Sequence, residues 1–299
     1  VIRDEGIGTP ILLGNRAIVK SLILEHSLDL DEVEIIDPRM DDFEENRNNF
    51  GDLYFQKRKR KGVTLPDAKK IMRDRTHYGL MMLDSNEIDV FISSNSKEYQ
   101  DTLKPALQII GLKKEVKKVA GMYVLLTKKG PLFCSDTTVN VDPTTEDLID
   151  ITLLTANEVE QFNVKPKIAM LSYSNFGTGK QASPTKVRKA AEYLHKFHPE
   201  LIVDGEMQAN LALNTETLDE MYPFCQLDDK GANTLIFPNL SAGNIAYKLL
   251  QEVGGCEAIG PILMGLKKPV QVLQLGSSVR DIVNMVTIGV VESQIKNEL

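Results

Sequence analysis

Residues 170–180, MLSYSNFGTGK, place two glycines and several hydroxyl side chains directly after an apolar run. A strand that ends in a glycine turn and leads into a helix presents backbone N–H groups to an anion. The hydroxyls of Ser172, Ser174 and Thr178 add further donors. The segment therefore predicts a phosphate-binding turn, and the alternative is a simple turn without a ligand.

Two nucleotide motifs fit this segment less well. A Walker A loop requires a hydroxyl residue after its lysine, whereas Gln181 follows Lys180. The stretch GTGKQA, residues 177–182, has the spacing of a dinucleotide fingerprint after a strand. In that fingerprint the glycines themselves open the helix, but Ser183 and Pro184 indicate that the helix begins after the motif.

The composition is that of a globular protein with one to three domains. The chain has 299 residues, of which 42% are hydrophobic and 26% charged. Its net charge of −7 argues against general nucleic-acid binding, which requires clustered cations. Cys134, Cys225 and Cys256 form neither a disulfide framework nor a zinc motif, so we expect buried thiols and no metal site.

The hydropathy of the sequence and its first residue indicate the cellular compartment and whether the chain is part of a longer polypeptide. No apolar stretch approaches the ~20 residues that span a membrane, and no signal peptide is present, so we expect a cytoplasmic protein. Because the chain begins at Val1 without an initiator Met, we expect it to be a piece of a longer polypeptide.

Strands and helices alternate along most of the chain. Apolar runs predict strands at 10–14, 33–37, 88–93, 168–174, 234–238, 259–263 and 270–275. Capping residues and amphipathic spacing predict helices at 17–26, 101–110 and 241–253, and helices that begin near 65, 145, 183 and 279. Residues 121–134 read as an antiparallel hairpin. This order is typical of α/β proteins with mainly parallel sheets, and the strand number suggests two domains with a ligand cleft between them.

Longer motifs along the chain resemble the phosphate acetyl/butyryl transferase family. The glycine turn is similar to the family's S-x-S-T-K-G-S-A. Seven further stretches resemble family motifs and occur along the chain in the same order as in the family. They are RKRKG (58–62), DTLKPALQII (101–110), VNVDPT (139–144), DGEMQ (204–208), IFPNLSAGN (236–244), EAIGP (257–261) and DIVN (281–284). The resemblance covers nearly the whole chain.

The resemblance implies two three-layer α/β/α domains of the isocitrate/isopropylmalate dehydrogenase type, with CoA and acyl phosphate bound in the cleft between them. It places residues 1–113 and 263–299 in the first domain, which lacks the family's first strand, and 114–262 in the second. The ligand residues that it implies are Arg58, Lys104, Thr137, Ser172, Ser174, Asn175, Phe176, Gly177, Thr178, Gly179, Asn244 and Asp281. Asp281 matches the family's proposed base toward the CoA thiol; alternatively, it caps the last helix.

Several positions depart from the family pattern. Gln274 and Leu275 stand where the family has the serine and arginine of S-R-G-C-S. Lys104 replaces an arginine, Thr137 replaces a cysteine, and residues 175–176 replace a Thr-Lys pair. An arginine offers phosphate a bidentate fork and a leucine offers none. The resemblance with these replacements predicts a cleft that binds CoA but retains no catalytic residues.

Residues 174–177 (SNFG), 272–276 (VLQLG) and 283–285 (VNM) resemble one branch, the C-terminal phosphotransacetylase-like domain of bacterial multidomain NADP-dependent malic enzymes. This implies a regulatory and oligomerising domain with acetyl-CoA or CoA as effector. Its partners would be a second copy of the chain and its own N-terminal malic-enzyme region, which holds NADP and a divalent metal and converts malate to pyruvate and CO₂. The alternative is an active phosphate acetyltransferase, which makes acetyl-CoA and phosphate from acetyl phosphate and CoA. A third possibility is a scaffold that only dimerises.

Overall fold

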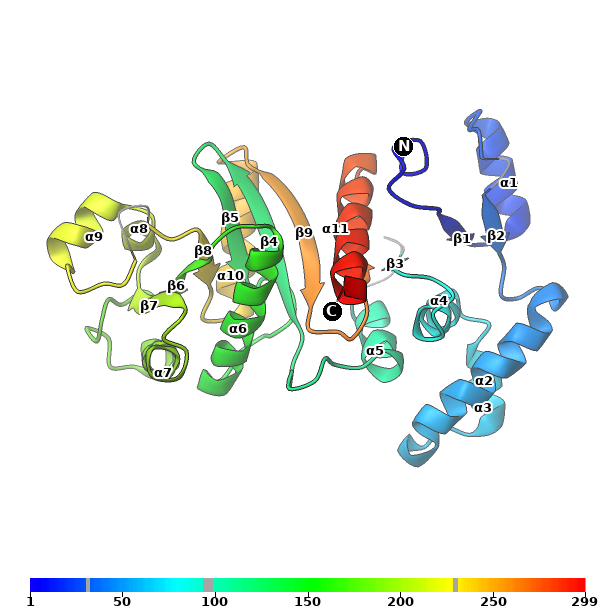
Figure 1. Ribbon diagram of the computed structural model, residues 1–299, viewed down its shortest axis with the longest axis horizontal. Coiled ribbons are helices and arrows are strands. Elements are labelled where there is room, and N and C mark those ends of the chain that lie inside the picture. Colours follow the sequence, from blue (N-terminus) through cyan, green and yellow to red (C-terminus); the bar gives the residue numbers. More distant parts are fainter. Residues whose placement is uncertain (31–32, 94–98, 228–230, 299) are drawn as a thin grey trace. The chain divides into compact units, whose positions relative to one another are not determined.

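The computed structural model describes residues 1–30, 33–93, 99–227 and 231–298 (Figure 1). The chain divides into two compact units. Unit 1 consists of Val1–Gly111 and Leu266–Leu299, and unit 2 of Leu112–Gly265. The sequence predicts this order of segments with boundaries at 113 and 263; that the units are separate domains, with a cleft between them, stays a prediction.

Unit 2 is built on one six-stranded sheet with the strand order β7-β6-β8-β5-β4-β9. Strands β5, β6, β7 and β8 pair in parallel, and β4 pairs antiparallel with both β5 and β9. The strands are β4 (Ala120–Thr127), β5 (Gly130–Ser135), β6 (Lys167–Leu171), β7 (Ile202–Met207), β8 (Thr234–Ile236) and β9 (Glu257–Met264). The predicted hairpin and the predicted parallel strands at 168 and 234 are therefore confirmed.

Helices cover both faces of this sheet. Helix α6 (Thr145–Gln161) lies on one face and α10 (Leu240–Glu252) on the other (Figure 1). Alternate residues of β4 point to opposite faces. Tyr123 and Leu125 therefore share one apolar cluster with Tyr247 of α10, whose ring stacks on that of Tyr123 at 4.0 Å between centroids. The remaining helices of unit 2 are α7 (Ala182–Phe197), α8 (Ala209–Ala212) and α9 (Thr215–Met221).

Helix α6 begins where the sequence predicts, and its first turn is a capping box. The Asp147 N–H donates to Thr144 Oγ1 over 3.2 Å, and the Thr144 N–H donates to Asp147 Oδ2 over 3.0 Å. Lys118 Nζ lies 2.7 Å from the same carboxylate oxygen. Two otherwise unsatisfied helix N–H groups and one cation are thus held by a single pair of side chains.

Replacing Asp147 with Asn is expected to lower the free energy of unfolding by about 1 kcal/mol at pH 7. Burial acts to raise the pKa of Asp147, but hydrogen bonds from Lys118 and Thr144 outweigh it and hold that pKa below its ordinary value of 3.8. The stabilisation is therefore present above the unfolded-state pKa and is lost as pH falls through the folded-state value. Urea unfolding of both proteins from pH 7 downwards checks this, because the difference between them should shrink toward acid. Glu146→Gln, in the same turn but exposed, is the control and should change little.

The strands of unit 1 pair in parallel, as expected. Its described residues form two separate two-stranded parallel sheets, β1 with β2 and β3 with β10. The strands are β1 (Ile11–Leu13), β2 (Glu34–Ile36), β3 (Phe91–Ser93) and β10 (Val270–Val272). The helices are α1 (Arg16–Glu25), α2 (Glu44–Arg58), α3 (Leu65–Ile71), α4 (Arg75–Asp84), α5 (Tyr99–Ile109) and α11 (Val279–Glu298).

Gly79 of α4 allows strands of both small sheets to pack against the same helix. A Cβ at this position would lie 2.4 Å from the Phe91 ring and 2.6 Å from Leu13 Cδ1. Strands from both sheets therefore pack on α4 where it has no side chain. Three-residue strands offer few ladder hydrogen bonds, so packing on the buried helix holds them more than pairing does.

The C-terminal end of α4 is capped from a distant part of the chain. Lys268 Nζ donates to the carbonyl oxygens of Leu83 and Asp84, at 2.5 and 3.1 Å, and to Asn86 Oδ1 at 2.6 Å. Burial lowers the pKa of Lys268, although the nearby Asp84 carboxylate opposes that effect. A cation at the negative end of the helix dipole stabilises α4.

Across the described ranges of the chain, no helix combines the length and the apolar character needed to cross a membrane.

Candidate functional site

The predicted ligand residues fall into two sets, one in each unit. Unit 1 contains Arg58, Lys104, Gln274, Leu275 and Asp281. Unit 2 contains Thr137, Ser172, the glycine turn at 174–179 and Asn244.

The glycine turn follows β6 and is held by its own hydroxyl groups. Ser174 is buried, and its Oγ lies 2.9 Å from Thr178 Oγ1. The Gly179 N–H donates to Ser174 Oγ over 2.6 Å, and the Asn175 N–H donates to Thr178 Oγ1 over 3.1 Å. The predicted turn is present, but these two hydroxyls stabilise the turn itself.

Glu206 of β7 occupies the acceptor position that the sequence assigns to a phosphate. Its side chain is fully buried, and Oε1 accepts hydrogen bonds from the Gly177 N–H at 3.0 Å and from Ser174 Oγ at 3.1 Å. Arg188 Nη1 of α7 lies 3.4 Å from the same oxygen. A carboxylate of the chain itself therefore accepts from these two donors, and phosphate binding by the turn stays a prediction.

Phe176 and Gly177 have left-handed backbones, with φ values of +43° and +95°. The Phe176 N–H donates to the backbone oxygen of Glu206 over 2.8 Å, and its ring packs against the rings of Tyr222 and Phe224. Asparagine and glycine tolerate this region but phenylalanine rarely does, so the aromatic packing compensates for strain at Phe176.

Thr137 and Asn244 do lie together, beside a carboxylate that the sequence analysis missed. Asn244 Nδ2 donates to the Thr137 carbonyl over 3.3 Å, and the buried Thr137 hydroxyl donates to the Gly121 carbonyl over 3.2 Å. Asp136 accepts from four backbone N–H groups, those of Gly121 and residues 138–140. Asp136 therefore shapes the loop in which the VNVDPT motif begins.

In unit 1, Lys104 of α5 borders a cavity of about 300 Å³. The other lining residues are Ile71, His77, Gln100, Asp101, Pro105 and Gln108. His77 Nδ1 lies 2.9 Å from Asp74 Oδ1, so the carboxylate fixes the orientation of the imidazole. The cavity thus presents one cation, one oriented imidazole, two amides and one carboxylate to a ligand.

Arg58 is linked to this cavity through Tyr54. The Tyr54 hydroxyl donates to Gln108 Oε1 over 3.0 Å, and Gln108 lines the cavity. Burial raises the pKa of Tyr54, while the adjacent Arg58 guanidinium acts to lower it. Arg58 Nε is buried without a hydrogen-bond partner within the described residues. Two predicted cations, from α2 and α5, therefore belong to one neighbourhood of unit 1.

The segment before the last helix is exposed. Gln274 and Leu275 both face solvent, and Leu275 is 88% exposed. The Ser278 N–H and hydroxyl each donate to Asp281 Oδ2 over 2.8 Å, and the Asp281 N–H donates back to Ser278 Oγ. Asp281 thus caps α11, as the alternative interpretation expects; its role as a base stays a prediction.

Cys134 is buried, as expected, whereas Cys225 and Cys256 are only partly buried. Burial raises the pKa of Cys134 and that of Cys225 to about 12 each. Within the part of the chain that the structure describes, no three His, Cys, Asp or Glu side chains are grouped closely enough to hold a metal ion.

The sequence profile of the phosphate acetyl/butaryl transferase family matches residues 1–290. The phosphate acetyltransferase of Clostridium acetobutylicum is 36% identical over 98% of this chain and 89% of its own length. The NADP-dependent malic enzyme of Escherichia coli is also 36% identical, over 97% of this chain but only 38% of its own length. A phosphotransacetylase structure from Streptococcus pyogenes superposes with a TM-score of 0.88, at 34% identity, covering 98% of this chain and 88% of that one. The chain therefore belongs to the phosphate acetyl/butaryl transferase family.

Proposed function

We propose that this chain binds CoA and acetyl phosphate and transfers the acetyl group between phosphate and CoA, with a slow transfer step. The supporting observation is the match to a phosphate acetyltransferase along 98% of this chain and 89% of that relative. The cavity beside Lys104 offers a cation to a phosphate group. The proposal includes the expectation that units 1 and 2 act as two α/β/α domains.

We expect the acetyl transfer step to be slow because Gln274 and Leu275 replace the family's serine and arginine. An oxyanion or phosphoryl group is stabilised by preorganised donors, and losing one donor typically costs about 10²–10³ in rate. Neither side chain carries the positive charge or fork of an arginine. Ground-state binding through Lys104 and Arg58 does not depend on these positions.

A second candidate is a regulatory domain that binds acetyl-CoA without transferring its acetyl group. The same replacements at Gln274 and Leu275 favour it, together with the similarity to malic enzymes. In this form the chain would act on its own N-terminal malic-enzyme region in the cytoplasm, as part of a homo-oligomer. Helix α10 carries an exposed apolar stripe, Ile245, Leu249 and Val253, of the kind that subunit contacts cover.

One assay separates the two candidates. Acetyl phosphate and CoA are mixed with the purified chain, and thioester absorbance is followed over time, while CoA binding is measured by titration calorimetry. Slow transfer with binding supports the enzyme. Binding without any transfer favours the regulatory domain, and the absence of both contradicts the proposed function.

Lys104→Gln is expected to raise the Kd for CoA about tenfold, because a charge-assisted hydrogen bond to a phosphate oxygen is lost. Calorimetric titration of CoA into the two proteins measures the change. Lys114→Gln removes the same charge from another exposed lysine, which does not line the cavity beside Lys104. An equal effect of both substitutions would mean that Lys104 contributes only general electrostatics.

A further inference from the structure

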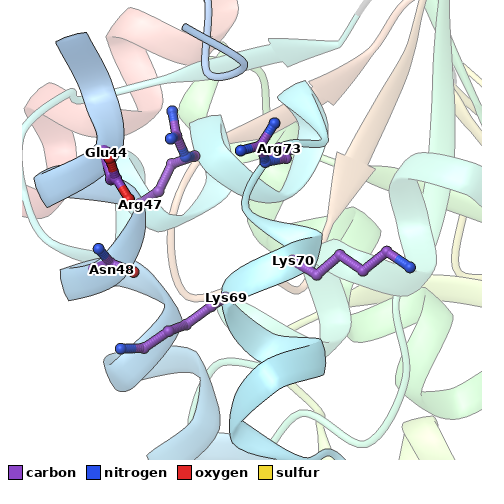
Figure 2. A pocket seen from close by; sticks show the side chains of 6 residues that line it. All are labelled: Glu44, Arg47, Asn48, Lys69, Lys70 and Arg73. Atoms are coloured by element: carbon purple, nitrogen blue, oxygen red, sulfur yellow. The ribbon is translucent and has the colours of Figure 1, made fainter. Parts of the chain in front are cut away.

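A second cavity of unit 1 lies between α2 and the end of α3 (Figure 2). Its volume is about 220 Å³, and none of its lining residues belongs to the cavity beside Lys104. It is lined by Glu44, Arg47, Asn48, Lys69, Lys70 and Arg73. Four cationic side chains and one carboxylate therefore border one cavity, in a chain whose net charge is −7.

Two of these cations already have partners. Lys69 Nζ lies 3.4 Å from Asp52 Oδ1. Arg47 is buried, and its Nη1 donates to the carbonyl oxygens of Pro38, at 3.0 Å, and Met40. Backbone carbonyls fix the position of the Arg47 guanidinium but do not neutralise its charge. One side of the cavity therefore carries a positive charge in a fixed position.

Arg73 borders the same cavity as Arg47. In Figure 2, Lys70 extends away from the two arginines. Within the described ranges, Glu44 forms no ion pair with either arginine, and Arg73 has no acidic partner. Two like charges that border one cavity without an anion repel each other, and a bound anion reverses the sign of that interaction. Paired guanidinium forks also match the geometry of phosphate oxygens.

We propose that this cavity is a binding site for a phosphate group, held between Arg47 and Arg73 with the Asn48 amide as a further donor. The phosphate comes either from inorganic phosphate or from a phosphomonoester on a larger ligand. The inference does not depend on the proposed function, because it involves neither Lys104 nor the segment before α11.

Titration calorimetry of the whole chain at low ionic strength tests the site. One series uses inorganic phosphate and the other uses adenosine 3′,5′-bisphosphate, and binding of both or of only one identifies the source of the phosphate. Arg73→Gln is expected to raise the Kd of the bound probe at least about tenfold. Arg73→Lys should weaken binding less, because it keeps the charge and loses only the fork.

Two further variants make the result specific. Lys20→Gln removes one exposed positive charge from α1 and should leave the Kd unchanged. Lys104→Gln alters the other cavity, so comparing it with Arg73→Gln separates binding there from binding between Arg47 and Arg73. The proposal is overturned if neither probe binds at up to about 10 mM, a weak-affinity limit, or if Lys104→Gln weakens binding while Arg73→Gln does not. The second result would assign the phosphate to the cavity beside Lys104.

Discussion

The double variant Gln274→Ser/Leu275→Arg is expected to form acetyl-CoA from acetyl phosphate and CoA at least about 100-fold faster than the unaltered chain. The two changes restore a hydroxyl and a bidentate cation at the positions where the family has them. An arginine that stabilises charge developing on a phosphoryl oxygen lowers the barrier, whereas the ground-state complex gains less. The increase should therefore appear mainly in kcat.

The local structure tolerates this change. Leu275 is 88% exposed, so its replacement removes no core packing. The turn is held by the Ser277 N–H and hydroxyl, which donate to the Gln274 carbonyl over 3.1 and 2.8 Å. Both bonds use the backbone of Gln274, so a new side chain at that position leaves them intact.

The thioester assay measures the gain, and Val279→Arg provides the matched control. Val279 is 68% exposed and lies in the same segment, so its substitution adds the same charge four residues away. The control should leave the rate nearly unchanged. If the double variant is no faster than the natural sequence, Gln274 and Leu275 do not explain a slow transfer step. If the natural sequence already transfers the acetyl group rapidly, these two residues do not limit the rate.

Glu206→Ala is expected to loosen the glycine turn and to lower the free energy of unfolding of unit 2 by about 3 kcal/mol. The substitution leaves the Gly177 N–H and the Ser174 hydroxyl without their buried acceptor and removes the carboxylate partner of Arg188. Truncating one member of such a group costs the desolvation of those that remain. Glu206→Gln keeps an acceptor oxygen and should cost less.

Amide hydrogen exchange reports the local effect and urea unfolding reports the global one. Exchange of the Gly177 amide should become faster in Glu206→Ala. Glu200→Gln removes a carboxylate whose side chain is 66% exposed, and it should change neither measurement. Unaltered exchange at Gly177 in the alanine variant would mean that Glu206 does not hold the turn.

The sequence predicted many of the strands and helices, because the responsible signals are local. Apolar runs mark β6 and β8, and Thr144 marks the start of α6. It did not predict α2, α4 or β7, and it did not show how the short strands of unit 1 are held. The strands there are three residues long, and their packing on Gly79 of α4 is a contact that no periodicity reveals.

By itself the sequence determined the family, the glycine turn and the replacements at Gln274 and Leu275, since these are matters of residue type and spacing. Only the tertiary structure decided where the donors of that turn point, because Glu206 lies some thirty residues further along and reaches it through strand pairing. The same holds for the position of Arg47 and Arg73 at one cavity. Electrostatic contacts depend on separations of a few ångströms, and chain folding, not distance along the sequence, sets those separations.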